Sequence, residues 1–182
     1  MKIVLCGDGG VGKTVLRDRY LGRGFQTKYM MTIGADFALK EATVDNNKIR
    51  FQIWDLAGQQ RFANVRAVYY TGCLGGLLLF DVTRRDSFEN CTNWIKEIWK
   101  HNGRGVIPIV LLGNKADLRD SHPDAITSDV AKKFAMELSD QTRPHGFDIH
   151  YLDTSAKTGQ NVVEAFDELG RVYFSFIEKL KK

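Results

Sequence analysis

Cysteine and histidine are scarce in this sequence, and neither is spaced as in a stabilising framework. Three cysteines and four histidines stand among 182 residues. The cysteines, Cys6, Cys73 and Cys91, lie in apolar or helical contexts, which predicts buried free thiols in a reducing compartment. The histidines are scattered without the spacing of a zinc site. We therefore expect neither a disulfide scaffold nor a zinc protein.

Long apolar runs and long basic runs are missing as well. No stretch reaches the roughly 18 to 20 apolar residues that cross a bilayer, and no basic leader precedes an apolar core. "NCT" at Asn90 matches a glycosylation acceptor, but nothing else indicates secretion, so we expect a cytoplasmic chain. The net charge of +4 is mild and favours a solvated surface over a nucleic-acid footprint.

The length and the hydrophobic pattern predict one α/β domain over residues 1–182. A chain of 182 residues is one domain's worth, and it has no repeats, low-complexity tracts or linker. Strand-like runs alternate with helical spacing, which indicates a mostly parallel sheet between helices. The expected strands are 2–6, 35–44, 48–55, 75–82, 106–114 and 147–154. The second and third meet at "DNN", which favours a hairpin.

The expected helices carry terminal signals. One follows at residues 13–21, and another covers Phe88, Cys91, Ile95 and Ile98, with Asp86 and Glu89 as a capping box. A third is expected over 128–138. The last begins near Asn161, with Glu164 placed to complete its cap, and carries one apolar stripe: Val162, Phe166, Leu169, Tyr173, Phe176 and Leu180.

"GDGGVGKT", residues 7–14, fits the pattern G-x-x-x-x-G-K-[ST] between a strand and a helix. Glycines let consecutive backbone N–H groups turn toward phosphate oxygens, and the helix N-terminus adds a favourable dipole. Lys13 would bring a positive charge to the outer phosphates. The Thr14 hydroxyl is a hard ligand of the kind that Mg²⁺ prefers. This loop predicts binding of a nucleoside triphosphate.

Two tetrapeptides at strand ends indicate which base is bound. "NKAD" (114–117) follows an apolar strand, and "TSAK" (154–157) ends the last one. The Asp117 carboxylate can accept from the two adjacent donors of guanine, a pair that adenine lacks. Asn114 would brace the loop and touch the base edge, and the Lys115 stem can cover a base face. An ATP-dependent enzyme such as a kinase shares the phosphate loop but leaves both tetrapeptides unexplained.

With these motifs in place, the chain resembles a small GTPase of the Ras superfamily, most like the Rab branch, from Lys2 to about Leu180. The resemblance rests on "TIGADF" (32–37), "RFQIWDLAGQQRF" (50–62), "YYTG" (69–72) and "LLFDVTRRDSFENCTNW" (78–94). It implies the P-loop NTPase fold, a mostly parallel six-stranded sheet with one antiparallel edge hairpin, sandwiched by about five helices. It also implies GTP and GDP as ligands, with Mg²⁺ as the cofactor.

The resemblance carries roles onto matching positions. It implies Gln59, Lys13 and Thr32 as catalytic residues, with Gln59 orienting the attacking water. It implies Thr14, Thr32 and Asp55 as metal-binding residues, and Gly9 as a loop glycine over the phosphates with no side chain to obstruct the γ-phosphate. The nucleotide-binding residues that it implies are Gly9, Gly10, Val11, Gly12, Lys13, Thr14, Val15, Phe25, Thr32, Gly58, Asn114, Lys115, Asp117, Leu118, Ser155, Ala156 and Lys157.

Regulatory partners follow from the same resemblance. The switch segments, about 23–37 and 56–70, are expected to bind an activating protein, an exchange factor and effectors. Arg61 and Arg66 lie in the second segment, and nothing in the family pattern aims them at the phosphate. We therefore expect slow intrinsic hydrolysis by a monomer, accelerated in trans. The alternative is a GTP-binding interaction module with negligible intrinsic hydrolysis.

The sequence also departs from the family pattern. Leu56 stands where threonine is more common, and Gln60 where a glutamate assists nucleotide release. Residues 139–148 are longer and more polar than usual, which indicates a surface insertion. The chain shows no C-terminal cysteine for prenylation, so membrane association stays unproven, although a lipidated tail would make the protein peripheral on membranes.

Overall fold

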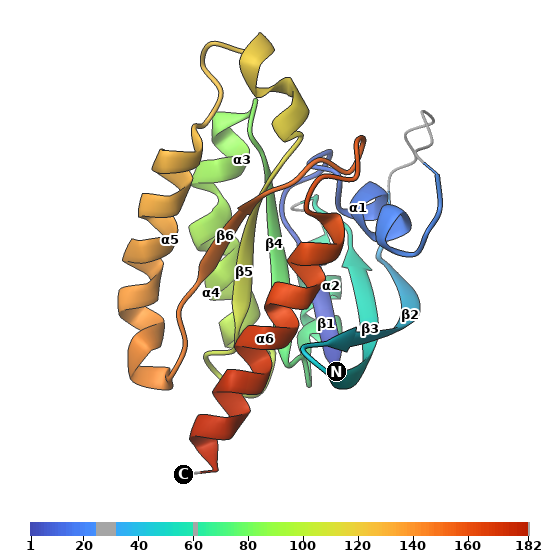
Figure 1. Ribbon diagram of the computed structural model, residues 1–182, viewed down its shortest axis with the longest axis vertical. Helices are drawn as coiled ribbons and strands as arrows, with labels where there is room; N and C mark the ends of the chain where they lie inside the picture. The colour runs from blue at the N-terminus through green and yellow to red at the C-terminus, as the bar shows by residue number, and fades with distance from the viewer. Residues whose placement is uncertain (25–31, 60–61, 182) are drawn as a thin grey trace.

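The computed structural model describes residues 1–24, 32–59 and 62–181, and the sheet at its centre confirms the expected fold class (Figure 1). Six strands lie in the order β2-β3-β1-β4-β5-β6. β2 and β3 pair antiparallel at one edge, and the other neighbours are parallel. The strands are β1 (Lys2–Cys6), β2 (Ala35–Val44), β3 (Asn47–Leu56), β4 (Gly75–Asp81), β5 (Ile109–Asn114) and β6 (His150–Asp153).

Helices cover both faces of the sheet (Figure 1). α1 and α6 lie on one face, and α2, α3, α4 and α5 lie on the other. Their bounds are α1 (Lys13–Tyr20), α2 (Ala63–Tyr70), α3 (Arg85–Glu89), α4 (Cys91–His101), α5 (Ser128–Thr142) and α6 (Val162–Leu180), with 3-10 turns η2 (Ala116–Ser121) and η3 (Arg143–His145). None of these helices is long and apolar enough to cross a membrane, within the part of the chain that is described.

Burial along the strands explains the layers. All seven residues of β4 and all six of β5 are buried, as expected for central parallel strands that are covered on both faces. β2 alternates between exposed and partly buried residues, because helices cover only one of its faces. The three cysteines are buried free thiols, as predicted.

Several predicted boundaries are wrong at their ends. The helix expected to stop at 138 continues to Thr142, and η3 follows it. Residues 139–148 thus form the last turn of this helix, η3 and the approach to β6, and most of them are exposed. Two buried hydroxyls anchor the segment: Ser139 Oγ accepts from Ile149 N at 2.8 Å, and Thr142 Oγ1 donates to Phe147 O at 2.8 Å. The strands expected at 106–114 and 147–154 are shorter, since their flanks leave the ladder.

The capping predictions also need correction. The helix expected around residues 88–98 is two helices, α3 and α4, that meet at Asn90. Asp86 accepts from the next backbone N–H, Ser87 N, at 2.8 Å. At α6, Glu164 accepts from Arg171 at 2.7 Å, and the Asn161 side chain donates to Asp153 O. Ion pairing and loop contacts thus replace the expected caps.

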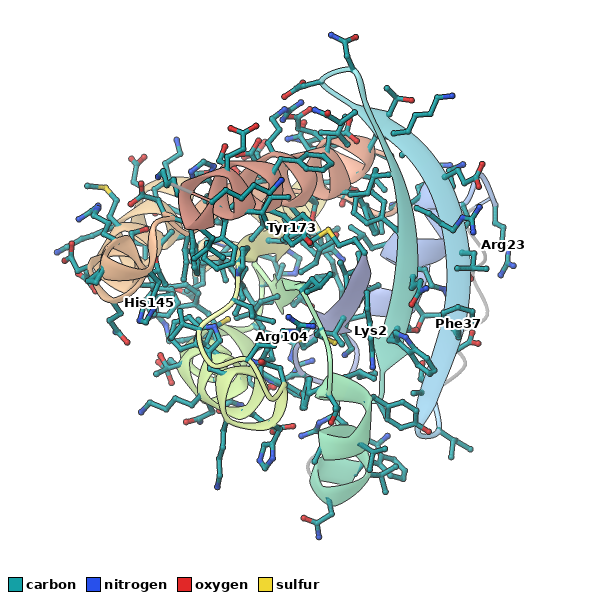
Figure 2. The ribbon with its side chains drawn as sticks, turned by 90° about the horizontal axis from the view of Figure 1, so that it is seen from below. Lys2, Arg23, Phe37, Arg104, His145 and Tyr173 are labelled. Atoms are coloured by element: carbon teal, nitrogen blue, oxygen red, sulfur yellow. The ribbon has the colours of Figure 1, made fainter. Side chains whose placement is uncertain are left out.

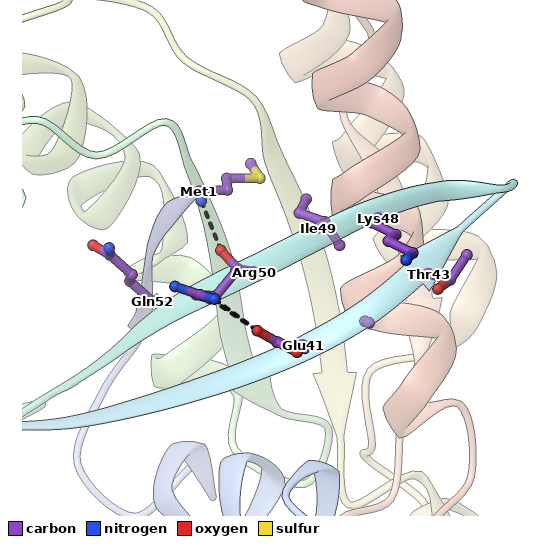
Figure 3. A pocket seen from close by; sticks show the side chains of 8 residues that line it. Met1, Glu41, Thr43, Lys48, Ile49, Arg50 and Gln52 are labelled. Carbon is purple, nitrogen blue, oxygen red and sulfur yellow. Dashed lines mark hydrogen bonds and ion pairs between the residues drawn. The ribbon is translucent and has the colours of Figure 1, made fainter.

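The loops after β1, β5 and β6 gather at one end of the sheet, while Met1 and the C-terminal end of α6 lie at the other (Figure 1). An open pocket lies near Met1, between the start of β1 and the turn of the β2–β3 hairpin (Figure 3). Its lining groups pair with one another: Met1 N donates to Arg50 O, and Arg50 pairs with Glu41. The chemistry-bearing motifs lie at the opposite end.

Candidate nucleotide site

The phosphate loop runs from the end of β1 to the start of α1, beside the point where the chain order of the sheet reverses. Ligands of open α/β sheets bind at such a switch point. Gly10 and Gly12 have φ of 80° and 100°. A Cβ on Gly12 would lie 2.4 Å from Asn114 Nδ2, so only glycine fits where this loop meets the end of β5.

Lys13 lies under the loop and is 7% exposed. Its ammonium donates to Gly7 O at 2.6 Å and to Asp8 O at 2.9 Å. Burial lowers the pKa of Lys13 to about 8, although the nearby Asp55 carboxylate favours the charged form. The loop thus presents a desolvated cation that an anionic ligand would stabilise.

Three oxygens of predicted metal-binding residues converge beside Lys13. Thr14 Oγ1 lies 2.5 Å from Asp55 Oδ2 and 3.0 Å from Thr32 Oγ1. Asp55 is fully buried, and within the described residues its Oδ1 has no hydrogen-bond partner. Burial raises the pKa of this carboxyl group. An orphaned carboxylate oxygen beside two hydroxyls fits a hard divalent cation such as Mg²⁺.

A buried arginine adds charge to this cluster. Arg17, on α1, is 3% exposed. Its Nη1 lies 2.6 Å from Asp36 Oδ2 at the start of β2 and 3.8 Å from Asp55 Oδ2. Arg17 therefore ties the segment that follows Thr32 to the helix that carries Thr14.

Gln59 and Gly58 lie against the phosphate loop. A Cβ on Gly9 would lie 3.8 Å from Gln59 Cγ, and a Cβ on Gly58 would lie 2.5 Å from Gly9 N. The backbone at Gly58 therefore approaches the loop as closely as glycine permits. This places the Gln59 side chain over the loop residue expected to face the γ-phosphate.

The base-side loops are joined through Asn114. Its Nδ2 donates to Val11 O at 2.7 Å. Its Oδ1 accepts from Thr154 Oγ1 and from Ala156 N, each at 3.2 Å. One buried amide therefore links the phosphate loop, the end of β5 and the loop after β6.

Asp117 and Lys115 are also held in place. Ser155 Oγ donates to Asp117 Oδ1 at 2.6 Å, while Asp117 itself is exposed. Lys115 has φ of 64°, in the left-handed region, and its ammonium pairs with Asp81 at 2.6 Å. These contacts orient a carboxylate at the site edge and a lysine stem beside it.

A second buried network holds the backbone around Gly58. Arg66 on α2 is 1% exposed and donates to Ala57 O at 3.1 Å and Gln59 O at 2.7 Å. It also pairs with both carboxylate oxygens of Glu97 on α4, at 2.9 and 3.0 Å. Tyr70 donates to the same carboxylate at 2.9 Å. Arg66 is therefore bound within the protein, in agreement with the expectation that it does not aim at the phosphate.

Side chains from the far side of the loop complete the arrangement. Asp8 accepts from Trp94 Nε1 at 2.8 Å and from Asn90 Nδ2 at 2.9 Å. Trp94 is buried. Arg84, between β4 and α3, donates to Gly9 O at 2.8 Å.

The structure brings most predicted site residues to one end of the sheet. Val11 is buried, and Val15 packs against the core. Leu118 N donates to Lys115 O. Lys157 is exposed, and its carbonyl accepts from Arg19. Phe25, Gln60 and Arg61 lie outside the described residues, so the expectations for them stay untested.

Sequence reasoning missed the charged residues that act between elements, namely Asp8, Arg17, Arg84 and Glu97. Asp8 occupies a variable position of the phosphate loop, and the other three lie outside the nucleotide motifs. Their partners in distant elements lie between 19 and 86 positions away in the sequence. One signal was available: Arg66 interrupts a mostly apolar stretch of α2, where a charge must be paired if it is buried.

A model of the Ras family matches residues 2–174. The Ras-related protein Rab-13 of Canis lupus familiaris is 42% identical over 170 residues, which cover 93% of this chain and 78% of that protein. The Ras-related protein Rab-8B of Homo sapiens is 39% identical, covering 93% and 76%. The Ras-related protein YPT3 of Nicotiana plumbaginifolia is 40% identical over 173 residues, covering 94% and 74%.

Proposed function

The chain belongs to the Ras family, and from this premise we propose which of its residues carry out the family's reaction. It is a small GTPase of the Rab type, a GTP-binding switch that hydrolyses GTP and acts in the regulation of membrane traffic. This membership argues against an ATP-dependent enzyme, and the hydrolysis experiment below distinguishes a switch from an interaction module with negligible intrinsic hydrolysis. We also propose that residues 1–182 form one domain.

Nucleotide binding is assigned to the two loop systems. The backbone N–H groups of Gly9, Gly10 and Gly12 would surround the phosphates, with the Lys13 ammonium donating to their outer oxygens. The Asp117 carboxylate, which accepts a hydrogen bond from Ser155 Oγ, would also accept hydrogen bonds from guanine. The close contact between Gly12 and Asn114 supports both assignments, because it joins the phosphate loop to the base loop.

Mg²⁺ is proposed as the cofactor, held by Thr14 and Thr32 and, through water, by Asp55. The single observation that supports it is the buried Asp55 Oδ1 with no partner in the described part of the chain. When bound, the ion neutralises charge on the β- and γ-phosphates. Arg17 lies near the other carboxylate oxygen, Asp55 Oδ2, and pairs with Asp36 at the start of β2, so it leaves Oδ1 open to the ion.

Hydrolysis is assigned to Gln59, Lys13 and Thr32. The Gln59 amide would orient the water whose oxygen attacks the γ-phosphorus. The bond to the β–γ bridging oxygen breaks, its electron pair leaves with GDP, and the water proton ends on the released phosphate. The observation that carries this assignment is the position of the Gln59 side chain against Gly9. Arg66 supports Gln59 by holding its carbonyl.

Partner binding is proposed for residues 23–37 and 56–70. Large apolar side chains are exposed within these segments: Ile33 by 82%, Phe37 by 45% and Val68 by 73%. Phe37 projects outward from β2 on the same side of the molecule as Arg23 (Figure 2). Such a patch suits an activating protein, an exchange factor or an effector. We propose a cytoplasmic monomer that binds no nucleic acid, peripheral on membranes if a lipidated tail is present.

Single-turnover hydrolysis of preloaded GTP tests the catalytic assignment. Gln59→Leu should bind GTP as wild type does but hydrolyse it at least about tenfold more slowly. The reason is that leucine cannot orient the attacking water by hydrogen bonding. Equal rates for both proteins would remove Gln59 from the reaction. Intrinsic turnover of many GTP per second would contradict the need for a partner.

A further inference from the structure

We propose that Arg84 supplies a guanidinium group to the γ-phosphate during GTP hydrolysis, from within the same chain. The proposal rests on the proposed function, since it takes Gly9 as the loop residue nearest the γ-phosphate. It concerns a residue outside the nucleotide motifs and outside both switch segments.

Hydrogen bonds hold the backbone of Arg84 close to the nucleotide site. The residue lies three positions after the end of β4, and its backbone N–H donates to Asp81 O at 2.9 Å. Its carbonyl accepts from Ser87 Oγ at 2.7 Å. The backbone is extended there, with φ of −125° and ψ of 99°. The side chain therefore starts from a rigid corner at the carboxyl end of a buried strand.

The guanidinium reaches the phosphate loop. Arg84 Nη1 donates to Gly9 O at 2.8 Å, and Gln59 Cγ lies 3.8 Å from the position of a Cβ on the same glycine. The proposed water-orienting side chain and a positive charge thus meet on one loop residue. They come from different segments, Gln59 from the loop after β3 and Arg84 from the turn after β4.

The other contacts of Arg84 leave its guanidinium able to donate hydrogen bonds to a phosphate. Within the described residues its other ion pair is with Asp86, at 3.2 Å, and its side chain is 37% exposed. A guanidinium has five N–H donors in a planar fork that matches phosphate oxygens. Arg66, by contrast, is 1% exposed and is held by Glu97, so it cannot turn toward the loop.

The charge distribution of the reaction explains why this position matters. As the attacking oxygen bonds to the γ-phosphorus and the bridging oxygen departs, negative charge is spread over the equatorial and bridging oxygens. Rotation about the terminal side-chain bonds of Arg84 would carry its donors from the Gly9 carbonyl to these oxygens. A cation placed there stabilises the transition state more than bound GTP, and so raises the rate.

A purely structural role makes a different prediction. If Arg84 only braced the Gly9 carbonyl, its loss would weaken binding of GTP and GDP and leave the hydrolysis rate of bound GTP unaltered. A cation at the transition state does the reverse. The neighbouring Arg85 provides a matched control, because it is also an arginine at the start of α3 but is exposed.

The experiment is single-turnover hydrolysis of preloaded GTP with Mg²⁺, using the full chain and no partner. We expect Arg84→Ala to slow hydrolysis about 10- to 100-fold, which brackets the ratio between an intrinsic rate of about 10⁻² s⁻¹ with an arginine in cis and one below about 10⁻³ s⁻¹ without it. Arg84→Lys should fall in between, because a point charge lacks the fork. Arg85→Ala should match wild type, and GDP affinity should stay within about threefold in all variants. Added guanidinium ion should partly restore Arg84→Ala.

A transition-state mimic gives the second readout. The GDP-loaded wild type should bind aluminium fluoride unaided, and Arg84→Ala should lose this binding while Arg85→Ala keeps it. Hydrolysis by Arg84→Ala within about twofold of wild type, with aluminium fluoride binding retained, would overturn the proposal. If Gln59→Leu were nevertheless slow, the proposed function would stand without Arg84. If neither substitution slowed hydrolysis, the catalytic assignment of Gln59 would fail together with that of Arg84.

Discussion

The two halves of the nucleotide site are built differently. On the base side, Asn114, Ser155 and Asp117 bond mainly to other residues of the protein. On the phosphate side, Lys13 is desolvated by burial and Asp55 has a buried oxygen with no partner in the described chain. The difference indicates that the base loops are preorganised for guanine, whereas the phosphate loop concentrates charge that a triphosphate and a metal ion would stabilise.

The largest effect is expected on the base side. Asp117→Asn exchanges an acceptor for a mixed amide, so the site should lose its preference for guanine and gain one for xanthine, whose 2-position is an acceptor. The ratio of GTP to XTP affinity should change by about 10⁴, the range for sites built on hydrogen bonds. Competition of the two nucleotides against labelled GDP measures it. An unaltered ratio would mean that Asp117 does not read the base.

A stability loss of about 3 kcal/mol is expected from Arg66→Ala on the phosphate side, because Glu97 would be left partly buried without its partner. Urea unfolding of the GDP-bound protein measures it. Arg50→Ala is the matched control, since the Arg50–Glu41 pair is 66% and 75% exposed and should contribute less than about 1 kcal/mol. Equal decreases in the free energy of unfolding for the two variants would show that burial does not make the Arg66–Glu97 pair more stabilising than an exposed pair.

Asp55→Asn should separate metal binding from folding. We expect the Mg²⁺ concentration needed to retain GTP to rise about 10- to 100-fold, the cost of losing a group that holds a metal through water. The same change should not destabilise the nucleotide-free chain, because burial already disfavours this carboxylate and raises its pKa. Nucleotide release during a Mg²⁺ titration gives the first quantity, and urea unfolding the second. A Mg²⁺ requirement like that of wild type would argue against the metal site.

The smallest effect concerns pH. The hydrogen bond to Glu168 raises the pKa of His150 on β6, and the His150 side chain is 47% exposed. Because the folded pKa lies above the unfolded value of about 6.5, the stabilisation is complete below pH 6.5 and disappears as pH rises through the folded pKa. The free energy of unfolding should be a few tenths of a kcal/mol larger at pH 6 than at pH 8 because of this pair, and His150→Gln should abolish that contribution. Guanine preference should be the same at both pH values.

Local patterns predicted the fold and the motif residues, and they failed where tertiary contacts decide. The run "GGLLLFD" is buried as expected, since central strands are covered on both faces. The extent of α5 was missed because Ser139 and Thr142 are polar, yet their hydroxyls bond within the protein. Arg84 was missed because its contact with Gly9 spans 75 positions, and no spacing rule links strand-end residues across a sheet.

The central claim is that the base side determines base choice and the phosphate side determines Mg²⁺-dependent binding, independently of one another. A double-mutant cycle tests this claim most directly. The affinities for GTP and XTP would be measured at saturating Mg²⁺ and with Mg²⁺ chelated, for wild type, Asp55→Asn, Asp117→Asn and the double variant. We predict that Asp55→Asn alters only the Mg²⁺ dependence, that Asp117→Asn alters only base choice, and that the coupling stays below about 0.5 kcal/mol. Coupling well above about 1 kcal/mol, or a change of base preference in Asp55→Asn, would contradict the account.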